Sequence, residues 1–224
     1  KVVIITDDLV DYPNTPNSIS EHKVDFVVEV ESVGDSSKIA SGTIRDTKNP
    51  RDILLAQQAA KVIINSGYFK DGFSIQTGSG GASLAAVKFI RESMIEKGIK
   101  ANYALGGITA HMVKMHEEGL IKRLIDVQSF DKVAAESVKN NEFHKEVSAS
   151  EYAAADEQGS ATHYLDIVIL SALEVDVDFN VNVLVGSDGI IRGAIGGHPD
   201  TAADSALSII VCPLLRGRIP CVVD

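Results

Sequence analysis

The chain has 224 residues, of which 45% are hydrophobic and 23% are charged, so it is long enough to bury a sizeable core in one large or two small domains. Its formal net charge of −10 argues against a non-specific nucleic-acid binder, which needs a basic surface. Aromatic residues make up only 5% and tryptophan is absent, so the expected core is aliphatic. No apolar run is long enough to span a membrane and no signal peptide is evident, which predicts a cytoplasmic protein.

The first third of the chain predicts two strands followed by a helix. The run "VVIITDDLV" is typical of a buried strand, "DYPNTPNSIS" of a loop, and "VDFVVEVESVG" of a second strand. The segment "DILLAQQAAKVIINSG" has helical length and good helix formers, and Gly67 is the expected stop. Because the chain begins and ends inside apolar strand-like runs, we expect an excised domain of a longer polypeptide.

The clearest unit is "GFSIQTGSGGASLAAVKFIRESMIEKG". A short strand over 73–76 runs into a glycine turn and then a helix. Four apolar residues at helical spacing form one stripe, and Gly98 is the expected end of the helix. They are Leu84, Val87, Ile90 and Met94.

The rest of the chain continues to alternate strands and helices before it changes character. "KANYALGG" predicts a strand, "HMVKMHEEG" a helix, "LIKRLIDVQ" a strand and "DKVAAESVKNN" a helix. "LDIVILSALEVD" is too rich in β-branched residues for a confident helix. Asp188–Gly189 between two alternating runs is a hairpin signal, and "LSIIVCPLLRGRIPCVVD" gives two apolar segments split by a basic turn.

This order predicts an α/β fold, with an open, mostly parallel, Rossmann-like sheet, helices on both faces and a mixed, hairpin-rich C-terminal part. In such sheets ligands bind beyond the carboxyl ends of the strands. Three glycine turns fall at expected strand ends, at Gly78–Gly81, Gly106–Gly107 and Gly193–Gly197. Their convergence, more than any single motif, predicts a site.

The turn "TGSGGAS" has two interpretations. Its glycines could let a phosphate or acyl oxygen approach backbone amides at the start of a helix, or they could simply form a tight strand-to-helix turn. As a dinucleotide fingerprint it is weak, because the acidic residue expected about 20 residues further on is absent. Ser79 does not lie in a nucleophile elbow of the G-x-S-x-G type.

The segment "GAIGGHPDTAADSA" combines a bare backbone with a histidine. Gly196 and Gly197 permit positive φ and close backbone approach. The proline that follows is expected to hold His198 out of the helical region, and Asp200 or Thr201 to cap the helix beyond it. His198 is either a turn residue or a group with a chemical role, and its sequence context leaves both open.

Other candidate residues carry weaker signals. Arg216, in "PLLRGRIP", could bind a carboxylate or pyrophosphate, or lie in a solvated turn. His111 and His116 are five residues apart, so they do not share a helix face, and no metal site is predicted. Cys212 and Cys221 lack metal-ligand spacing and are expected to be reduced, buried thiols.

Two long segments carry a family resemblance. "SALEVDVDFNVNV" followed by "GAIGGHPDTAADSALSIIVCPLLRGRIPCVVD" resembles the coenzyme A transferase superfamily. Together with "KVVIITDDLVDYPN" and "QTGSGGASLAAVKFI", these segments are similar to its citrate lyase alpha subunit family, nearly end to end. The resemblance implies a coenzyme A transferase-like domain over 1–224, one half of a two-domain chain and by expectation the C-terminal one.

The resemblance also implies an activity, which is the exchange of acetate for citrate on an acyl carrier (gamma) subunit with a coenzyme A-like prosthetic group. A lyase (beta) subunit would then cleave the citryl thioester. Acetyl-CoA is the small-molecule counterpart of the carrier. The residues expected at the site are Gly196, Gly197 and His198 for the reacting groups, and Gly78, Ser79, Gly80, Gly81, Gly106, Gly107 and Arg216 for the thioester carrier.

The sequence departs from many coenzyme A transferases, which use a glutamate nucleophile. The turn "LGGITAHMV", where the resemblance places it, contains no glutamate, and Glu174 lies elsewhere. The expected mechanism is therefore direct attack of the citrate carboxylate on the acetyl thioester, through a mixed anhydride. A non-catalytic half that docks the carrier or the beta subunit is the alternative. A sugar-phosphate isomerase would need a carboxylate base beside a phosphate loop, and no good candidate is present.

Overall fold

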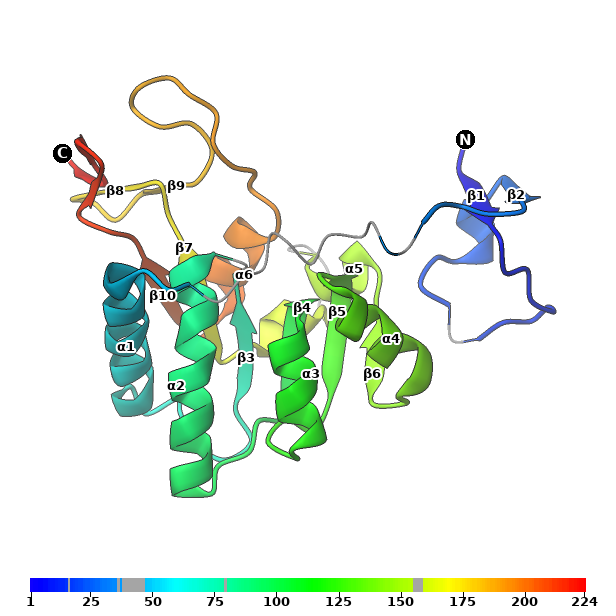
Figure 1. Cartoon of the computed structure of the whole chain (residues 1–224), viewed down its shortest axis with the longest axis horizontal. Helices are drawn as coiled ribbons and strands as arrows, with labels where there is room; N and C mark the ends of the chain where they lie inside the picture. The colour runs from blue at the N-terminus through cyan, green and yellow to red at the C-terminus, as the bar shows by residue number, and fades with distance from the viewer. Residues whose placement is uncertain (16, 36, 38–46, 79, 155–158) are drawn as a thin grey trace.

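A central sheet of six parallel strands organises the molecule, in the spatial order β10, β7, β3, β4, β5 and β6 (Figure 1). The computed structural model describes residues 1–15, 17–35, 37, 47–78, 80–154 and 159–224. In chain order the strands of the sheet are β3 (Ser74–Thr77), β4 (Tyr103–Ile108), β5 (Leu124–Ser129), β6 (His144–Glu146), β7 (Ile167–Ser171) and β10 (Leu207–Val211).

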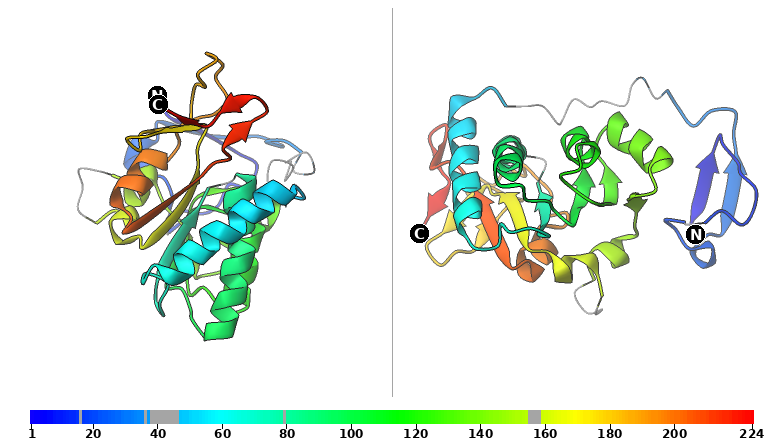
Figure 2. Two further views of the ribbon diagram at one scale, coloured as in Figure 1. Left: turned by 90° about the vertical axis from the view of Figure 1, so that its left-hand side faces the viewer. Right: turned by 90° about the horizontal axis from the view of Figure 1, so that it is seen from below.

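Helices cover both faces of this sheet (Figure 2). One face carries α1 (Pro50–Asn65), α2 (Gly81–Lys97), α3 (Ala110–Glu117) and α4 (Lys132–Asn140). The other carries the short elements α5 (Ala149–Tyr152), η4 (Ala161–Tyr164) and α6 (His198–Asp204). The predicted α/β fold with a parallel sheet between two helical layers is confirmed.

Strand β7 illustrates why the sheet needs two layers. Ile167 and Ile169 are buried in the core beneath the long helices, whereas Val168 and Leu170 are buried in the core on the opposite face. Successive side chains of a strand point to opposite faces, so an unbroken apolar run requires cover on both. Each of these side chains contributes roughly 1.5–3 kcal/mol through burial.

Helix α2 follows its sequence pattern closely. Leu84, Val87, Ile90 and Met94 are all buried, as the stripe predicted. Gly98 ends the helix with φ at 67°, in the left-handed region, and its N–H donates to the carbonyl of Ile95. Glycine adopts this conformation at little cost, so the predicted stop is confirmed.

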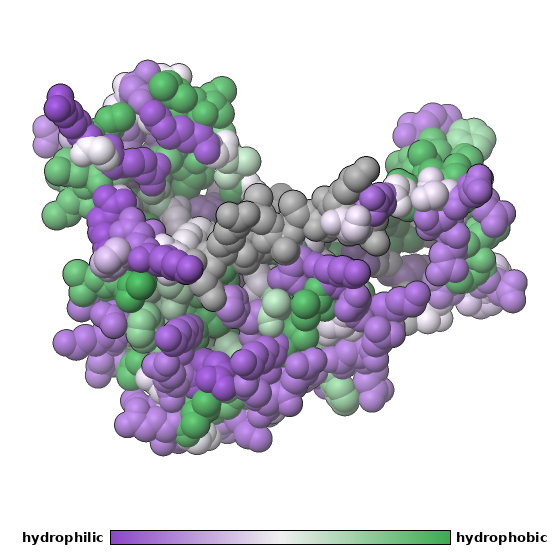
Figure 3. Space-filling model, in the orientation of Figure 1, coloured by the Kyte–Doolittle hydropathy of each residue, from purple (hydrophilic) through white to green (hydrophobic). Residues whose placement is uncertain are grey.

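The N-terminal strands differ from the prediction. β1 (Val3–Thr6) and β2 (Phe26–Glu29), joined through η1 (Glu21–Lys23), form a separate two-stranded parallel sheet beside the main body (Figure 1). The expectation of a buried first strand is wrong, because Val3 is 50% and Ile5 is 60% exposed. Hydrophobic side chains gather on the surface of this small unit (Figure 3). Within the described residues no further layer packs on it to bury them.

The C-terminal part is mixed and rich in hairpins, as predicted. β8 (Glu174–Asp176) pairs antiparallel with β9 (Val181–Asn182) and parallel with β13 (Val222–Val223). β11 (Leu215–Arg216) and β12 (Ile219–Pro220) form a tight hairpin.

Two further predictions for this part can be checked. A turn does form at Asp188–Gly189, where the N–H of Gly186 donates to the carbonyl of Ile190. Both cysteines are free thiols, with Cys221 buried but Cys212 only half-buried.

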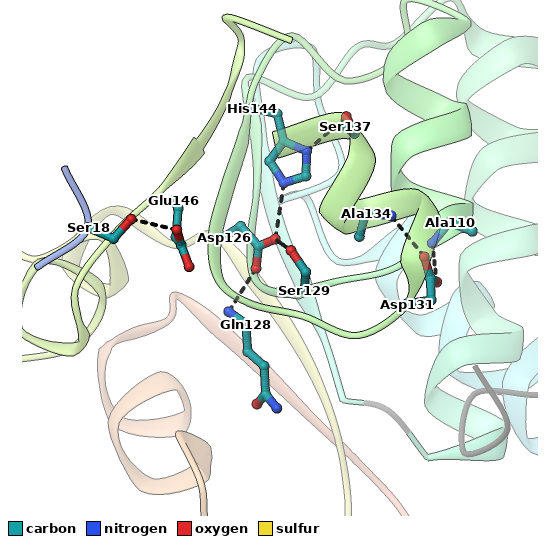
Figure 4. A network of polar contacts seen from close by, with 10 residues as sticks. All are labelled: Ser18, Ala110, Asp126, Gln128, Ser129, Asp131, Ala134, Ser137, His144 and Glu146. Carbon is teal, nitrogen blue, oxygen red and sulfur yellow. Dashed lines mark hydrogen bonds and ion pairs between the residues drawn. The ribbon is translucent and has the colours of Figure 1, made fainter. Parts of the chain in front are cut away.

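A single carboxylate anchors two helices at one edge of the sheet (Figure 4). Asp131 Oδ1 accepts from the N–H of Ala134 at 2.9 Å and so caps α4. Asp131 Oδ2 accepts from the N–H of Ala110, the first residue of α3, at 2.7 Å. Both bonds place negative charge at helix N-termini, where it interacts favourably with the helix dipoles.

Replacing Asp131 with alanine is expected to lower the free energy of unfolding by about 2–3 kcal/mol, because two helices lose a charged acceptor together. The matched control is Asn49→Ala. Asn49 caps only α1, through the N–H of Arg51, and its loss is expected to cost about 1 kcal/mol. Urea denaturation measures both variants, and an Asp131→Ala cost no greater than that of Asn49→Ala would contradict the double role.

Candidate functional site

A pocket of about 220 Å³ lies at the carboxyl ends of the central strands. Gly78 follows β3, Gly107 lies near the end of β4, Phe130 follows β5, and the segment 194–198, which leads into α6, closes the opposite side. Parallel strands all end at the same edge of their sheet, which is why segments far apart in the sequence meet here. The pocket thus brings together residues from all three predicted glycine turns.

The glycines of β4 make room for side chains. Gly106 has a φ of +99°, and a Cβ there would lie 2.8 Å from Gln76 Cδ. A Cβ on Gly107 would overlap the ring of Phe130. The pairing of β4 with β5 shifts register between these two residues, so the strand bulges at the pocket. The expectation of a turn at Gly106–Gly107 is thus wrong, since both residues lie in a bulged part of β4, where they make room for Gln76 and Phe130.

The loop before α6 uses its glycines in the same way. A Cβ on Gly197 would overlap the hydroxyl of Tyr152, and a Cβ on Gly193 would overlap the carbonyl of Val183. Gly196 has open space around it but a φ of +53°, which disfavours other residues. Within the described residues, no hydrogen bond uses the N–H of Gly196 or Gly197. These two amides are donors that the pocket could offer to an oxyanion.

A buried polar pair at the pocket was missed by sequence reasoning. Gln76 Nε2 donates to Tyr152 Oη at 2.7 Å, and the two residues are 6% and 7% exposed. Burial raises the pKa of the Tyr152 phenol, which keeps it protonated near neutral pH. Within the described part of the chain, no group donates to Gln76 Oε1. The partners are 76 residues apart, so no local motif could have revealed them.

His198 lines the pocket but not in the expected conformation. It is the first residue of α6, with Gly197 at the N-cap, so the expectation that proline holds it outside the helix is wrong. The expected side-chain cap is absent too, since no Asp200 or Thr201 side chain caps α6. Thr201 Oγ1 instead donates back to the carbonyl of Gly197 at 2.7 Å. Burial lowers the pKa of His198, which favours its neutral form.

The remaining predicted site residues lie outside the lining of this pocket. A Cβ on Gly80 would come 2.5 Å from Ser171 Oγ, and Gly81 faces Asp52 at the start of α1. Arg216 lies on the β11–β12 hairpin and donates to the carbonyl of Ala172 at 3.3 Å. Ser79 lies outside the described residues. The pocket therefore gathers Gly78, Gly107, Gly196, Gly197 and His198 from the predicted set, with Gly106 immediately behind Gln76.

A second polar network resembles a hydrolase triad but is structural (Figure 4). His144 Nδ1 lies 2.9 Å from Ser137 Oγ, and His144 Nε2 lies 3.2 Å from Asp126 Oδ2. The Asp126 carboxylate also accepts from Ser129 Oγ and from the N–H of Gln128. The His144 and Asp126 side chains are fully buried, so no substrate reaches them. The network instead fixes the end of β5 that leads into the pocket.

The described lining contains no carboxylate and no cluster of metal-ligating side chains. No aspartate or glutamate lines the pocket among the residues that the structure places. Glu174 is engaged elsewhere, since its carboxylate accepts from the N–H and hydroxyl of Ser187 at 2.6 Å. In the part of the chain described, no three His, Cys, Asp or Glu side chains are grouped as metal ligands, and no helix has the length and apolarity to cross a membrane.

Comparison with known proteins places the chain in a family. The family of the citrate lyase alpha subunit matches residues 1–224. The chain belongs to this family. It is 59% identical to the citrate lyase alpha chain of Haemophilus influenzae and 57% identical to that of Escherichia coli, in both cases over its whole length. It spans 45% and 44% of those two proteins. The expectation of a longer, two-domain chain stays a prediction. The expectation that this chain is the C-terminal half is wrong, because it matches the N-terminal part of these relatives.

Solved structures agree with this assignment. The alpha subunit of citrate lyase from Streptococcus mutans, solved in complex with citrate, is 56% identical, with a TM-score of 0.91 over 100% of this chain and 44% of that one. The malonate decarboxylase alpha subunit of Acinetobacter baumannii is 17% identical, with a TM-score of 0.56 over 90% of this chain and 37% of that one. The second likeness concerns the fold alone.

Replacing Gly197 with alanine is expected to destabilise the chain by about 1–3 kcal/mol, because the new methyl group overlaps the Tyr152 hydroxyl. Combining it with Tyr152→Phe, which removes that hydroxyl, should recover about 1 kcal/mol. Gly196→Ala is the matched control, since it adds backbone strain without this overlap. Chemical denaturation of the single and double variants gives the coupling energy of each glycine substitution with Tyr152→Phe. Equal coupling energies for Gly196→Ala and Gly197→Ala would contradict the contact.

His198 is expected to make the stability of the chain fall as the pH drops. Because its pKa is lowered from 6.5 in the folded state, the unfolded state binds a proton below that pH that the folded state does not. Stability is therefore lost as the pH falls from about 6.5 through the folded pKa. His198→Gln should reduce the difference in unfolding free energy between pH 7.5 and about 5.5. An unchanged difference would show that His198 titrates normally.

Proposed function

We propose that the full-length protein is a citrate CoA-transferase that replaces acetate by citrate on a thioester carrier. The observation that carries the proposal is a glycine-lined pocket without a carboxylate among its described residues, in a chain 56% identical to a protein solved with citrate. Membership of the citrate lyase alpha subunit family supports it. The carrier would be acetyl-CoA or the coenzyme A-like group of the acyl carrier subunit, and the beta subunit would receive the citryl product.

The chemistry needs two acyl transfers and no covalent enzyme intermediate. A citrate carboxylate oxygen attacks the acetyl carbonyl carbon, the C–S bond breaks, and the carrier leaves as a thiolate. The thiolate then attacks the citryl carbonyl of the mixed anhydride, and acetate leaves. Both steps pass through a tetrahedral oxyanion, which backbone N–H groups stabilise by about 3 kcal/mol per donor in comparable sites. Holding both partners together supplies much of the remaining acceleration.

The residues of the pocket suit this sequence. We propose that the amides of Gly196 and Gly197 donate to the oxyanion, since no described group occupies them. His198, neutral through burial, would line the passage between this pocket and an apolar one of about 360 Å³ that shares Leu170, Ile195 and His198 with it. The apolar pocket would take the pantetheine-like arm of the carrier.

A second candidate function is a docking module. β1 and β2 expose apolar side chains on a sheet that no other described layer covers, and the chain spans less than half of its relatives. We propose that this surface packs against the remainder of the longer chain. A pure docking role would leave the glycine-lined pocket unexplained, so catalysis is the preferred proposal.

The test is an exchange assay with the full-length chain. Acetyl-CoA and citrate should give citryl-CoA and acetate, detected by mass spectrometry, and the proposal is wrong if no citryl-CoA forms. Because no glutamyl thioester is expected, borohydride should leave the acetyl-CoA-treated enzyme active. A transferase with a glutamate nucleophile serves as the positive control, and inactivation of both enzymes would overturn the direct mechanism.

A further inference from the structure

We infer that Gln76 determines substrate specificity, with its Oε1 accepting a hydrogen bond from the hydroxyl group of a hydroxy-tricarboxylate such as citrate. The inference rests on the proposed function, which supplies the substrate class. It adds a residue and a contact that distinguish citrate from acids of the same shape and charge. The geometry of the Gln76 amide and the chemistry of the ligand carry the argument.

The amide of Gln76 is held from two sides. Gly106 lies against it, at a position where a Cβ would come within 2.8–3.0 Å of the amide atoms. Tyr152 Oη accepts from Nε2 at 2.7 Å, which turns Oε1 away from that bond. Gln76 is 94% buried, and both Gln76 and Tyr152 are among the residues that line the pocket. Oε1 is therefore a fixed, buried acceptor without a described donor, on a residue that lines the pocket.

An amide oxygen can accept a hydrogen bond only from a donor. The ionised carboxylates of citrate are acceptors and cannot supply one. The tertiary hydroxyl of citrate is its only donor near neutral pH, and acetate has none. The unpaired Oε1 thus matches the group that distinguishes citrate from tricarboxylates that have no hydroxyl.

The energetic consequence is discrimination against the analogue that lacks the hydroxyl. A site built to hydrogen-bond a substrate hydroxyl rejects such an analogue because its own buried polar atom stays unpaired. Propane-1,2,3-tricarboxylate is citrate without that hydroxyl. The wild-type chain should prefer citrate over it by about tenfold or more in kcat/KM.

The experiment compares both acids in the full-length chain and in Gln76→Leu. In this variant kcat/KM for citrate should fall about tenfold. Its kcat/KM for propane-1,2,3-tricarboxylate should stay level or rise, because the unpaired acceptor is gone. An equal loss on both acids would overturn the inference, since it would mean that the amide N–H₂ faces a carboxylate. An unchanged preference would overturn it too.

Controls separate specificity from folding. Gln58→Leu makes the same change on the exposed face of α1 and should leave the preference unaltered. If Gln76→Leu fails to fold, as judged by thermal unfolding, Tyr152→Phe removes the group that orients the amide, and it should lower the preference for citrate. A full preference in a folded Tyr152→Phe variant would count against the inference.

A binding measurement keeps this inference distinct from the proposed function. Calorimetric titration of the full-length wild-type chain and Gln76→Leu with citrate and propane-1,2,3-tricarboxylate needs no turnover. If citryl-CoA never forms but Gln76→Leu still removes the binding preference, the transferase proposal fails and the role of Gln76 stands. If exchange occurs and the binding preference does not depend on Gln76, the transferase proposal stands and the role of Gln76 fails.

Discussion

Parallel pairing of the six central strands is the constraint on which the site depends. It forces every strand to end at the same edge, so the turns that follow β3, β4 and β5 must lie side by side. Residues that are distant in the sequence then enclose one pocket together with the loop before α6. The sheet can hold this arrangement because both faces are buried beneath helices, which leaves little freedom for a strand to shift.

The glycines at that edge have a different meaning from the one that their sequence pattern indicates. A run of glycines at a strand end is usually interpreted as a bare backbone for a ligand. Here Gly106, Gly107 and Gly197 each stand where a Cβ would strike another side chain, which is Gln76, Phe130 or Tyr152 respectively. Packing therefore requires glycine at these three positions, before any ligand is considered. The amides of Gly196 and Gly197 lie at the pocket and donate no hydrogen bond among the described residues.

The sequence could predict features that depend on neighbouring residues and on the helical repeat. The buried stripe of α2 and the left-handed stop at Gly98 follow from helical spacing and from the conformational freedom of glycine. It could not predict the exposure of β1, because an apolar run looks the same whether or not another layer covers it. Nor could it predict the contact of Gln76 with Tyr152, which depends on the packing of α5 against the sheet. For the same reason the Asp126–His144 pair was invisible.

Two buried polar side chains near the pocket differ in how many of their hydrogen-bonding atoms have partners. That difference distinguishes a structural role from a role in ligand binding. Asp126 receives hydrogen bonds at both carboxylate oxygens, so its network is complete and its role is to fix the end of β5. Gln76 uses its N–H₂ group and leaves its carbonyl oxygen unpaired among the described residues. An unpaired buried acceptor destabilises the fold by roughly 1–3 kcal/mol, and nothing in the described fold offsets this penalty. Such an atom beside a pocket is most simply explained by a ligand that completes it.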